Sequence, residues 1–112
     1  MELINKETEK TIRQYPIGSQ EMEEDPVCFL KFFTPFGRAT WYVIEGKQEE
    51  DGDYLFFGYV ESPIDPLFNE LGYFTLNELK SIRGPLGLGV ERDLYYEPTR
   101  LTEIQEMMGI HE

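Results

Sequence analysis

The chain has 112 residues, a length that suits one domain with a single modest core. Its 22 acidic and 10 basic residues give a formal charge of -12, which repels phosphate backbones and disfavours a direct nucleic-acid binder. No apolar run approaches the ~20 residues of a membrane span, and the polar N-terminus lacks an apolar signal region. We therefore expect a cytoplasmic protein that does not bind membranes.

The first 26 residues predict a helix followed by a charged loop. Residues 2–13 carry a weak apolar stripe of Leu3, Ile4 and Ile12, and Pro16 closes the segment. Residues 1–20 could therefore lie at the periphery of the domain. The loop ends in a run of acidic residues, which are Glu21, Glu23, Glu24 and Asp25.

Five later segments have the length and the aromatic or β-branched composition of strands. They are residues 27–33, 40–45, 54–60, 70–74 and 93–97. Short turns join several of them, and consecutive strands joined in this way are normally antiparallel neighbours. The prediction is one α+β domain over residues 1–112, with an antiparallel sheet of about four to five strands and helices packed mainly on one face.

A second acidic run lies between the second and third of these strands and contains Glu49, Glu50, Asp51 and Asp53. The chain reverses at Pro35, so the second strand should end near the point where the first begins. We therefore expect the two acidic runs to lie at the same end of the sheet.

A patterned stretch covers residues 71–96. Thr75 and Glu78 match a capping box that opens a helix, and Gly84 with Pro85 ends it. Gly87 and Gly89 make the following turn permissive, but the turn has neither the ending nor the position of a phosphate-binding loop. Thr102 and Gln105 repeat the capping-box pattern and predict a last helix, whose apolar side chains are Ile104, Met107 and Met108.

Several strings in the chain resemble an uncharacterised family of small bacterial proteins classed as a domain of unknown function. They are FLKFFTP, TWYVIE, FFGYV, ELGYFTLNELKSIRGPLGLGVERDLYYEP and LTEI. The resemblance covers about residues 27–104 and implies a bacterial protein with a role on plasmids, phages or conjugative elements. It implies no activity, and no catalytic residue is carried over from it.

The charges around the glycine turn are the candidate catalytic site. If residues 90–96 are extended, Glu91 and Asp93 point to one face and Arg92 to the other. Two carboxylates on one face could hold a divalent cation or act as acid and base, with Arg83 or Arg92 stabilising negative charge. The alternative is a structural ion-pair cluster in which Arg83 pairs with one of these acids.

Two further arrangements are weaker. Cys28 lies in an apolar run, and the single histidine, His111, is near the C-terminus, so a buried thiol is favoured over a nucleophile. Asp25 with Glu45 and Lys47 loosely matches the acid and E-x-K pattern of metal-dependent nucleases, which is common by chance. We predict no cofactor.

The leading hypothesis is an interaction protein without catalytic activity. The two acidic runs would meet a basic surface of a partner, such as a DNA-handling protein. The aromatic side chains cannot all be buried in so small a domain, and a sheet face rich in Tyr and Trp is another possible surface for a protein partner. These aromatic side chains belong to Trp41, Tyr42, Tyr54, Phe56, Tyr59, Tyr73, Tyr95 and Tyr96. A small metal-dependent hydrolase or nuclease and an oligomerising module are the alternatives.

Overall fold

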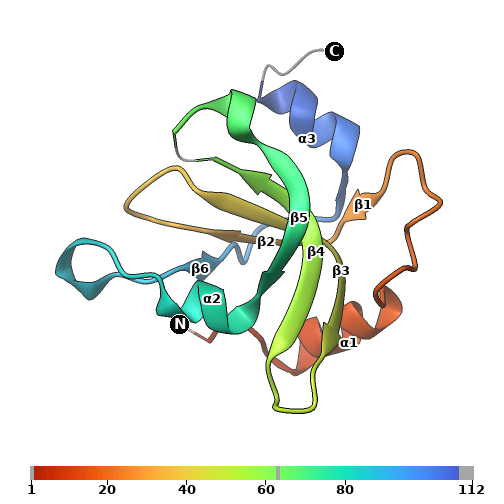
Figure 1. Ribbon diagram of the computed structural model, residues 1–112, viewed down its shortest axis with the longest axis horizontal. Coiled ribbons are helices and arrows are strands. Elements are labelled where there is room, and N and C mark those ends of the chain that lie inside the picture. Colours follow the sequence, from red (N-terminus) through yellow and green to blue (C-terminus); the bar gives the residue numbers. More distant parts are fainter. Residues whose placement is uncertain (1, 63, 109–112) are drawn as a thin grey trace.

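The computed structural model describes residues 2–62 and 64–108. In this part of the chain, five antiparallel strands form the main sheet in the order β5-β4-β3-β2-β6, and β1 pairs with β7 separately (Figure 1). The strands are β1 (Val27–Cys28), β2 (Leu30–Phe33), β3 (Thr40–Gln48), β4 (Tyr54–Glu61), β5 (Glu70–Thr75), β6 (Glu91–Arg92) and β7 (Thr99–Arg100). The helices are α1 (Lys6–Gln14), α2 (Leu76–Ser81) and α3 (Leu101–Met107), with 3-10 turns at Pro66–Phe68 (η1) and Pro85–Gly87 (η2). The predicted α+β class and antiparallel sheet are confirmed.

The main sheet bends sharply, and Figure 1 shows β4 and β5 running almost across the direction of β2 and β6. The bend coincides with a change of register between Val43 and Glu45 on β3, where Gly58 of β4 lies opposite Val43. A Cβ atom on Gly58 would lie 1.9 Å from the carbonyl oxygen of Tyr42, so only glycine fits there. Gly58 therefore marks a close approach of two backbones beside an irregularity in the strand register.

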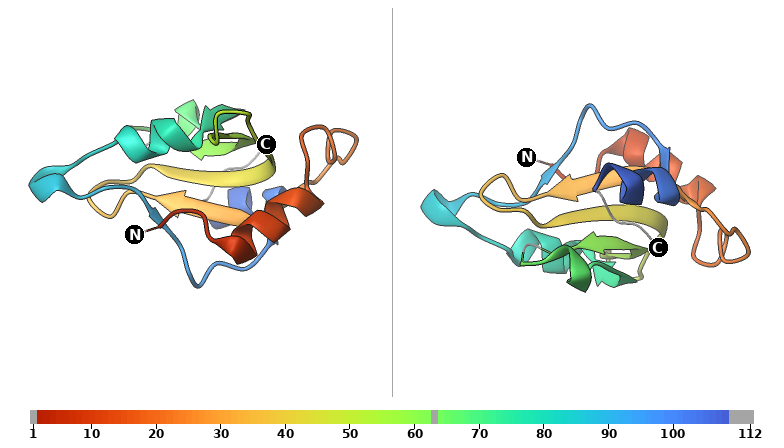
Figure 2. Two further views of the ribbon diagram at one scale, coloured as in Figure 1. Left: turned by 90° about the horizontal axis from the view of Figure 1, so that it is seen from below. Right: turned by 90° about the horizontal axis from the view of Figure 1, so that it is seen from above.

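Each face of the sheet has its own core because side chains alternate along a strand. The larger core contains Phe32, Val43 and Phe56 from the strands and receives α1 and α2 through Ile12 and Leu79. The smaller core has α3 on the other face and comprises Cys28, Tyr42, Ile44, Tyr59, Leu101 and Ile104. In the described part of the chain, α1 and α2 therefore both pack into the larger core, and Figure 2 shows helices on both sides of the strands.

The N-terminal segment is part of the core. Leu3 and Ile12 are 5% and 2% exposed and belong to the larger cluster. The helix begins later than predicted because Asn5 caps it, accepting a hydrogen bond from the Thr8 amide while the Thr8 hydroxyl accepts one from the Asn5 amide. Leu3 and Ile12 therefore attach this segment to the sheet.

Two predicted strands differ from the structure. The segment 27–33 is divided at Phe29, because β1 pairs with β7 while β2 pairs with β3. The predicted strand 93–97 is wrong, because the Asp93 side chain accepts a hydrogen bond from the Tyr95 amide and turns the chain. This turn lets the Tyr96 hydroxyl donate to the carbonyl of Cys28.

Candidate functional site

A groove rimmed by acidic side chains lies between the loop of residues 17–26 and strands β4 and β5. Its volume is about 370 Å³. The rim carries Glu21, Glu23 and Glu24, and the apolar lining includes Phe57, Leu71, Tyr73 and Leu101. Among the residues that the structure describes, no lysine or arginine lines this hollow, which we call the acidic groove.

The loop that carries the rim is fixed to the sheet by two buried polar side chains. The Glu45 carboxylate, only 5% exposed, accepts hydrogen bonds from the amides of Gly18 (2.7 Å) and Gln20 (2.8 Å). The Gln20 side chain donates to the carbonyls of Val27 and Ile44 and accepts from the Val27 amide. The acidic side chains therefore project from a braced backbone.

Asp25 fixes the far end of the same loop by capping α3. Its carboxylate accepts hydrogen bonds from the Thr102 amide (2.9 Å) and the Thr102 hydroxyl (2.7 Å). These bonds, chiefly the one from the amide, hold the pKa of Asp25 below its ordinary value, with a smaller contribution from Arg100. The predicted capping box of Thr102 with Gln105 is not formed, since Thr102 uses its hydroxyl and amide on Asp25.

The apolar wall of the groove lies on an edge strand. Among the described strands, β5 pairs only with β4, and Tyr73 and Leu71 face the same side as their partners Phe57 and Tyr59. The smaller core covers Tyr59, but Leu71 and Tyr73 remain 48% and 63% exposed. An exposed apolar patch beside an acidic rim is typical of an interaction surface.

The second acidic run lies elsewhere. Residues 49–53 close the β3–β4 hairpin, and Asp53 accepts a hydrogen bond from the Asn77 amide at the start of α2. The first run is tied to α3, and Figure 1 shows the two loops apart. The expected convergence fails because β1 leaves the main sheet to pair with β7, which carries the preceding loop away from the hairpin.

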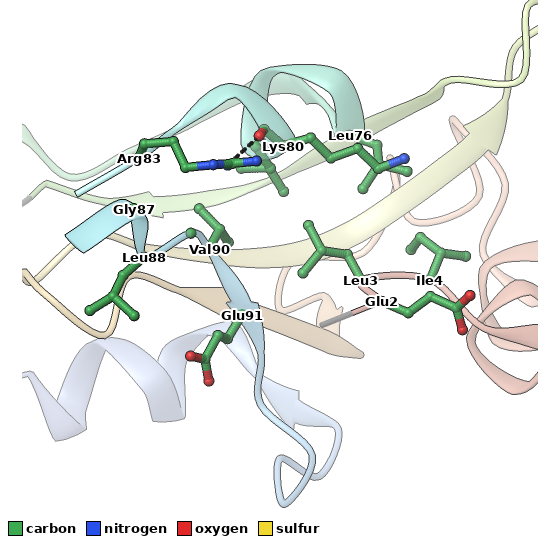
Figure 3. A pocket seen from close by; sticks show the side chains of 12 residues that line it. Glu2, Leu3, Ile4, Leu76, Lys80, Arg83, Gly87, Leu88, Val90 and Glu91 are labelled. Carbon is green, nitrogen blue, oxygen red and sulfur yellow. Dashed lines mark hydrogen bonds between the residues drawn. The ribbon is translucent and has the colours of Figure 1, made fainter. Parts of the chain in front are cut away.

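A second and larger hollow, of about 710 Å³, lies beneath the glycine turn (Figure 3). We call it the glycine-turn cleft. Arg83 and Lys80 form one wall, Leu3 and Val90 lie along the floor, and Glu91 is on the opposite side. The Nη1 atom of Arg83 donates to the carbonyls of Lys80 and Ile82.

The four charges predicted around the turn do not form one site. Arg83 and Glu91 line the glycine-turn cleft, whereas Arg92 and Asp93 border another hollow beside α1. Arg92 donates to the carbonyls of Glu2 and Leu3 and so holds the N-terminal segment against β6. Asp93 pairs with Lys31 at 3.6 Å, so one of the two predicted carboxylates already has a basic partner, while the register of β6 keeps Glu91 on the same side of the strand as Asp93.

The three residues of the nuclease-like pattern also contact different partners. Asp25 binds Thr102, while Glu45 binds the backbone of residues 18 and 20, and Lys47 lies near Glu49. In residues 2–62 and 64–108, no three His, Cys, Asp or Glu side chains are grouped to hold a metal ion. His111 lies outside the described residues.

Sequence patterns did not predict the hydrogen bonds of Glu45 that brace the loop, nor the apolar part of the groove. Glu45 stands in the apolar segment TWYVIE, and a carboxylate in such a strand needs hydrogen-bond donors if it is buried. That signal was available for Glu45. Leu71 had no comparable signal, because its exposure depends on β5 being at the edge of the sheet.

Comparison with known proteins identifies a family but no activity. Residues 3–108 match the family described as "Protein of unknown function (DUF2958)". No curated protein and no solved structure is similar enough to match the chain. Among the helices of the described residues, none has the length and apolar character required to cross a bilayer.

Proposed function

We propose that this chain, which belongs to the DUF2958 family, is an interaction protein whose acidic groove binds a basic segment of a partner protein. The single observation that carries the proposal is the composition of the groove. Three exposed glutamates stand beside the apolar wall of the groove, and no basic side chain of the described residues lines it. The segment that fits would carry lysine or arginine next to a large apolar side chain.

The rim retains its negative charge despite one ion pair. Arg100 lies 3.7 Å from Glu23, but both side chains are more than half exposed, and such pairs contribute little. Glu21 and Glu24 are exposed and have no ion pair in the described part of the chain. The rim would attract a basic segment over roughly the 8–10 Å of a Debye length at physiological salt.

The apolar wall would supply most of the binding free energy. Tyr73 is 63% exposed, and burial of an aromatic side chain in an interface stabilises a complex far more than rim charges do. Charge at the rim would mainly set the association rate and the choice of partner. This division predicts strong salt dependence of the association rate and weaker dependence of the dissociation rate.

A DNA-handling protein is the partner class that we propose to test first. Proteins that bind phosphate backbones carry clustered lysine and arginine, which suits an acidic groove. The chain's expected setting on plasmids, phages or conjugative elements points to the same class.

The experiment compares two variants that each remove three negative charges. E21Q/E23Q/E24Q neutralises the groove rim, and E49Q/E50Q/D51N neutralises the β3–β4 hairpin as a matched control. A display library of peptides rich in Lys, Arg, Leu and Trp is selected against the wild-type protein, and the best peptide is measured by isothermal titration calorimetry. We expect the groove variant to weaken binding at least ~10-fold and the hairpin variant less than ~2-fold.

Tyr73→Ala provides an independent arm. This substitution leaves the net charge unchanged and should also weaken binding of the selected peptide by ~10-fold or more. Equal losses in the two charge variants, or no loss in Y73A, would contradict a specific groove and leave only non-specific attraction to an acidic protein.

A further inference from the structure

The glycine-turn cleft has a charge pattern unlike that of the acidic groove. Its wall on the α2 side carries Lys80 and Arg83, and neither forms an ion pair with a carboxylate of residues 2–62 and 64–108. In Figure 3 the Glu91 carboxylate points away from the Arg83 guanidinium. Glu2 also lines the cleft, on the side opposite Lys80 and Arg83, so the two cations form one wall of a hollow that has acidic side chains across from it.

The Arg83 guanidinium is fixed before any ligand arrives. Its Nη1 atom bonds the carbonyls of Lys80 and Ile82, the latter at 2.8 Å. A Cβ atom on Gly89 would lie 3.2 Å from that nitrogen, so the absence of a side chain at Gly89 leaves room for the guanidinium. A guanidinium held in this way loses little conformational freedom when it binds an anion.

The floor of the cleft is apolar. Leu3, Leu76 and Val90 are at most 7% exposed and belong to the larger core, so the floor is rigid. Leu88, which is 43% exposed, borders the cleft from the glycine turn. The cleft volume of about 710 Å³ lies within the ~300–1,000 Å³ range of small-molecule sites.

We infer that the glycine-turn cleft binds a small organic anion that has an apolar body. The anionic group would accept hydrogen bonds from Arg83 and interact with Lys80, and the apolar body would lie against Leu88 and the floor. A phosphate or sulfonate and a carboxylate share this chemistry, and inorganic phosphate lacks the apolar body. The site is independent of the acidic groove.

The test uses 8-anilinonaphthalene-1-sulfonate, a fluorescent aromatic sulfonate, with phenyl phosphate and inorganic phosphate as competitors. Binding is located by ¹H–¹⁵N chemical-shift changes and quantified by fluorescence. We expect shifts at Val90 and Leu88, and competition by phenyl phosphate at concentrations where inorganic phosphate has no effect.

Variants then separate the site from general charge. K80Q/R83Q should weaken probe binding by roughly 10-fold or more, since charge-assisted hydrogen bonds are lost. K10Q/R38Q removes two positive charges elsewhere in the protein and should change the affinity for the probe by less than ~2-fold. Gly89→Leu, which crowds the guanidinium, should act like K80Q/R83Q while circular dichroism shows a folded protein.

Three outcomes would overturn the inference. They are equal effects of the two charge variants, shifts confined to Leu71 and Tyr73, and equal competition by inorganic and phenyl phosphate. The second outcome would assign the probe to the acidic groove, so failure here is distinguishable from failure of the proposed function.

Discussion

The two acidic loops have similar charge but are held in place in different ways. The loop of residues 17–26 depends on long-range side-chain contacts, since Glu45 and Gln20 fix its middle and Asp25 fixes its end to α3. The hairpin loop depends mainly on local backbone geometry, with a hydrogen bond from the Glu49 amide to the Asp53 carbonyl and Gly52 at φ +91°.

The difference teaches which acidic residues are suited to recognition. A loop braced by buried groups presents its charges in fixed positions beside an apolar wall, which favours selective binding. The tight hairpin presents its charges to solvent, and none of the hollows described above is lined by it. Acidic composition alone does not distinguish these two cases.

The largest expected effect is on the brace. Glu45→Ala removes two charge-assisted hydrogen bonds and leaves the buried Gln20 amide without its acceptor, so unfolding free energy should fall by about 3 kcal/mol. Urea denaturation measures this change. Hydrogen exchange should accelerate at Gly18 and Gln20 but not in the hairpin.

Glu49→Ala is the matched control in the hairpin and should change stability by less than about 0.5 kcal/mol. A similar cost for the two substitutions would show that the first loop is no better braced than the second.

The hairpin should instead be sensitive to its backbone. Gly52→Ala places a side chain at φ +91°, where L-residues are strained, although its Cβ would meet no atom within 4 Å. We expect a loss of about 1–2 kcal/mol in urea denaturation. An unchanged stability would mean that the turn relaxes to another geometry at no cost.

The Asp25 cap on α3 should contribute about 1 kcal/mol to the free energy of unfolding, and this contribution should depend on pH. Asp25→Ala removes the acceptor for the Thr102 amide, which is comparable to loss of an N-cap. The folded-state pKa of Asp25 is lowered, so its charged form stabilises the fold above the ordinary pKa of ~4, and this contribution is lost as pH falls through the folded pKa.

Thermal denaturation of wild type and D25A between pH 2 and 6 tests this linkage. The two curves should converge as pH falls below ~4. A constant difference across that range would show that the carboxylate charge contributes nothing to the cap.

The smallest effect is expected from E49Q/E50Q/D51N. These side chains are on the hairpin surface, so stability should change by less than about 0.5 kcal/mol. Differential scanning calorimetry at low salt is the measurement, and a loss above 1 kcal/mol would reveal contacts as strong as those of the first loop.

Sequence patterns predicted most of the main sheet because β2 to β5 form a meander of local pairings. The helix after Thr75 was predicted from its cap, and Thr75 does accept a hydrogen bond from the Glu78 amide. The pairing of β1 with β7 was not predicted, since it joins residues about 70 positions apart and each strand has only two residues.

The site was predicted less well for the same reason. Glu21, Glu23 and Glu24 were proposed from charge alone, but Leu71 and Tyr73, which line the same groove, are brought near them only by tertiary structure. The strand predicted to begin at Asp93 is wrong because the Asp93 side chain forms a turn where alternation suggested a strand. Short polar side chains that bond the nearby backbone often override a strand pattern in this way.

The sequence contains one cysteine, Cys28, which is 0% exposed beneath α3, and burial raises its pKa to about 12. Since the thiolate is the reactive form, alkylating reagents should reach this sulfur only when the surrounding structure opens. The chain therefore carries a built-in chemical reporter: the rate of iodoacetamide modification, divided by that of a free thiol, measures the fraction of time that the α3 side of the domain is open, without any added label.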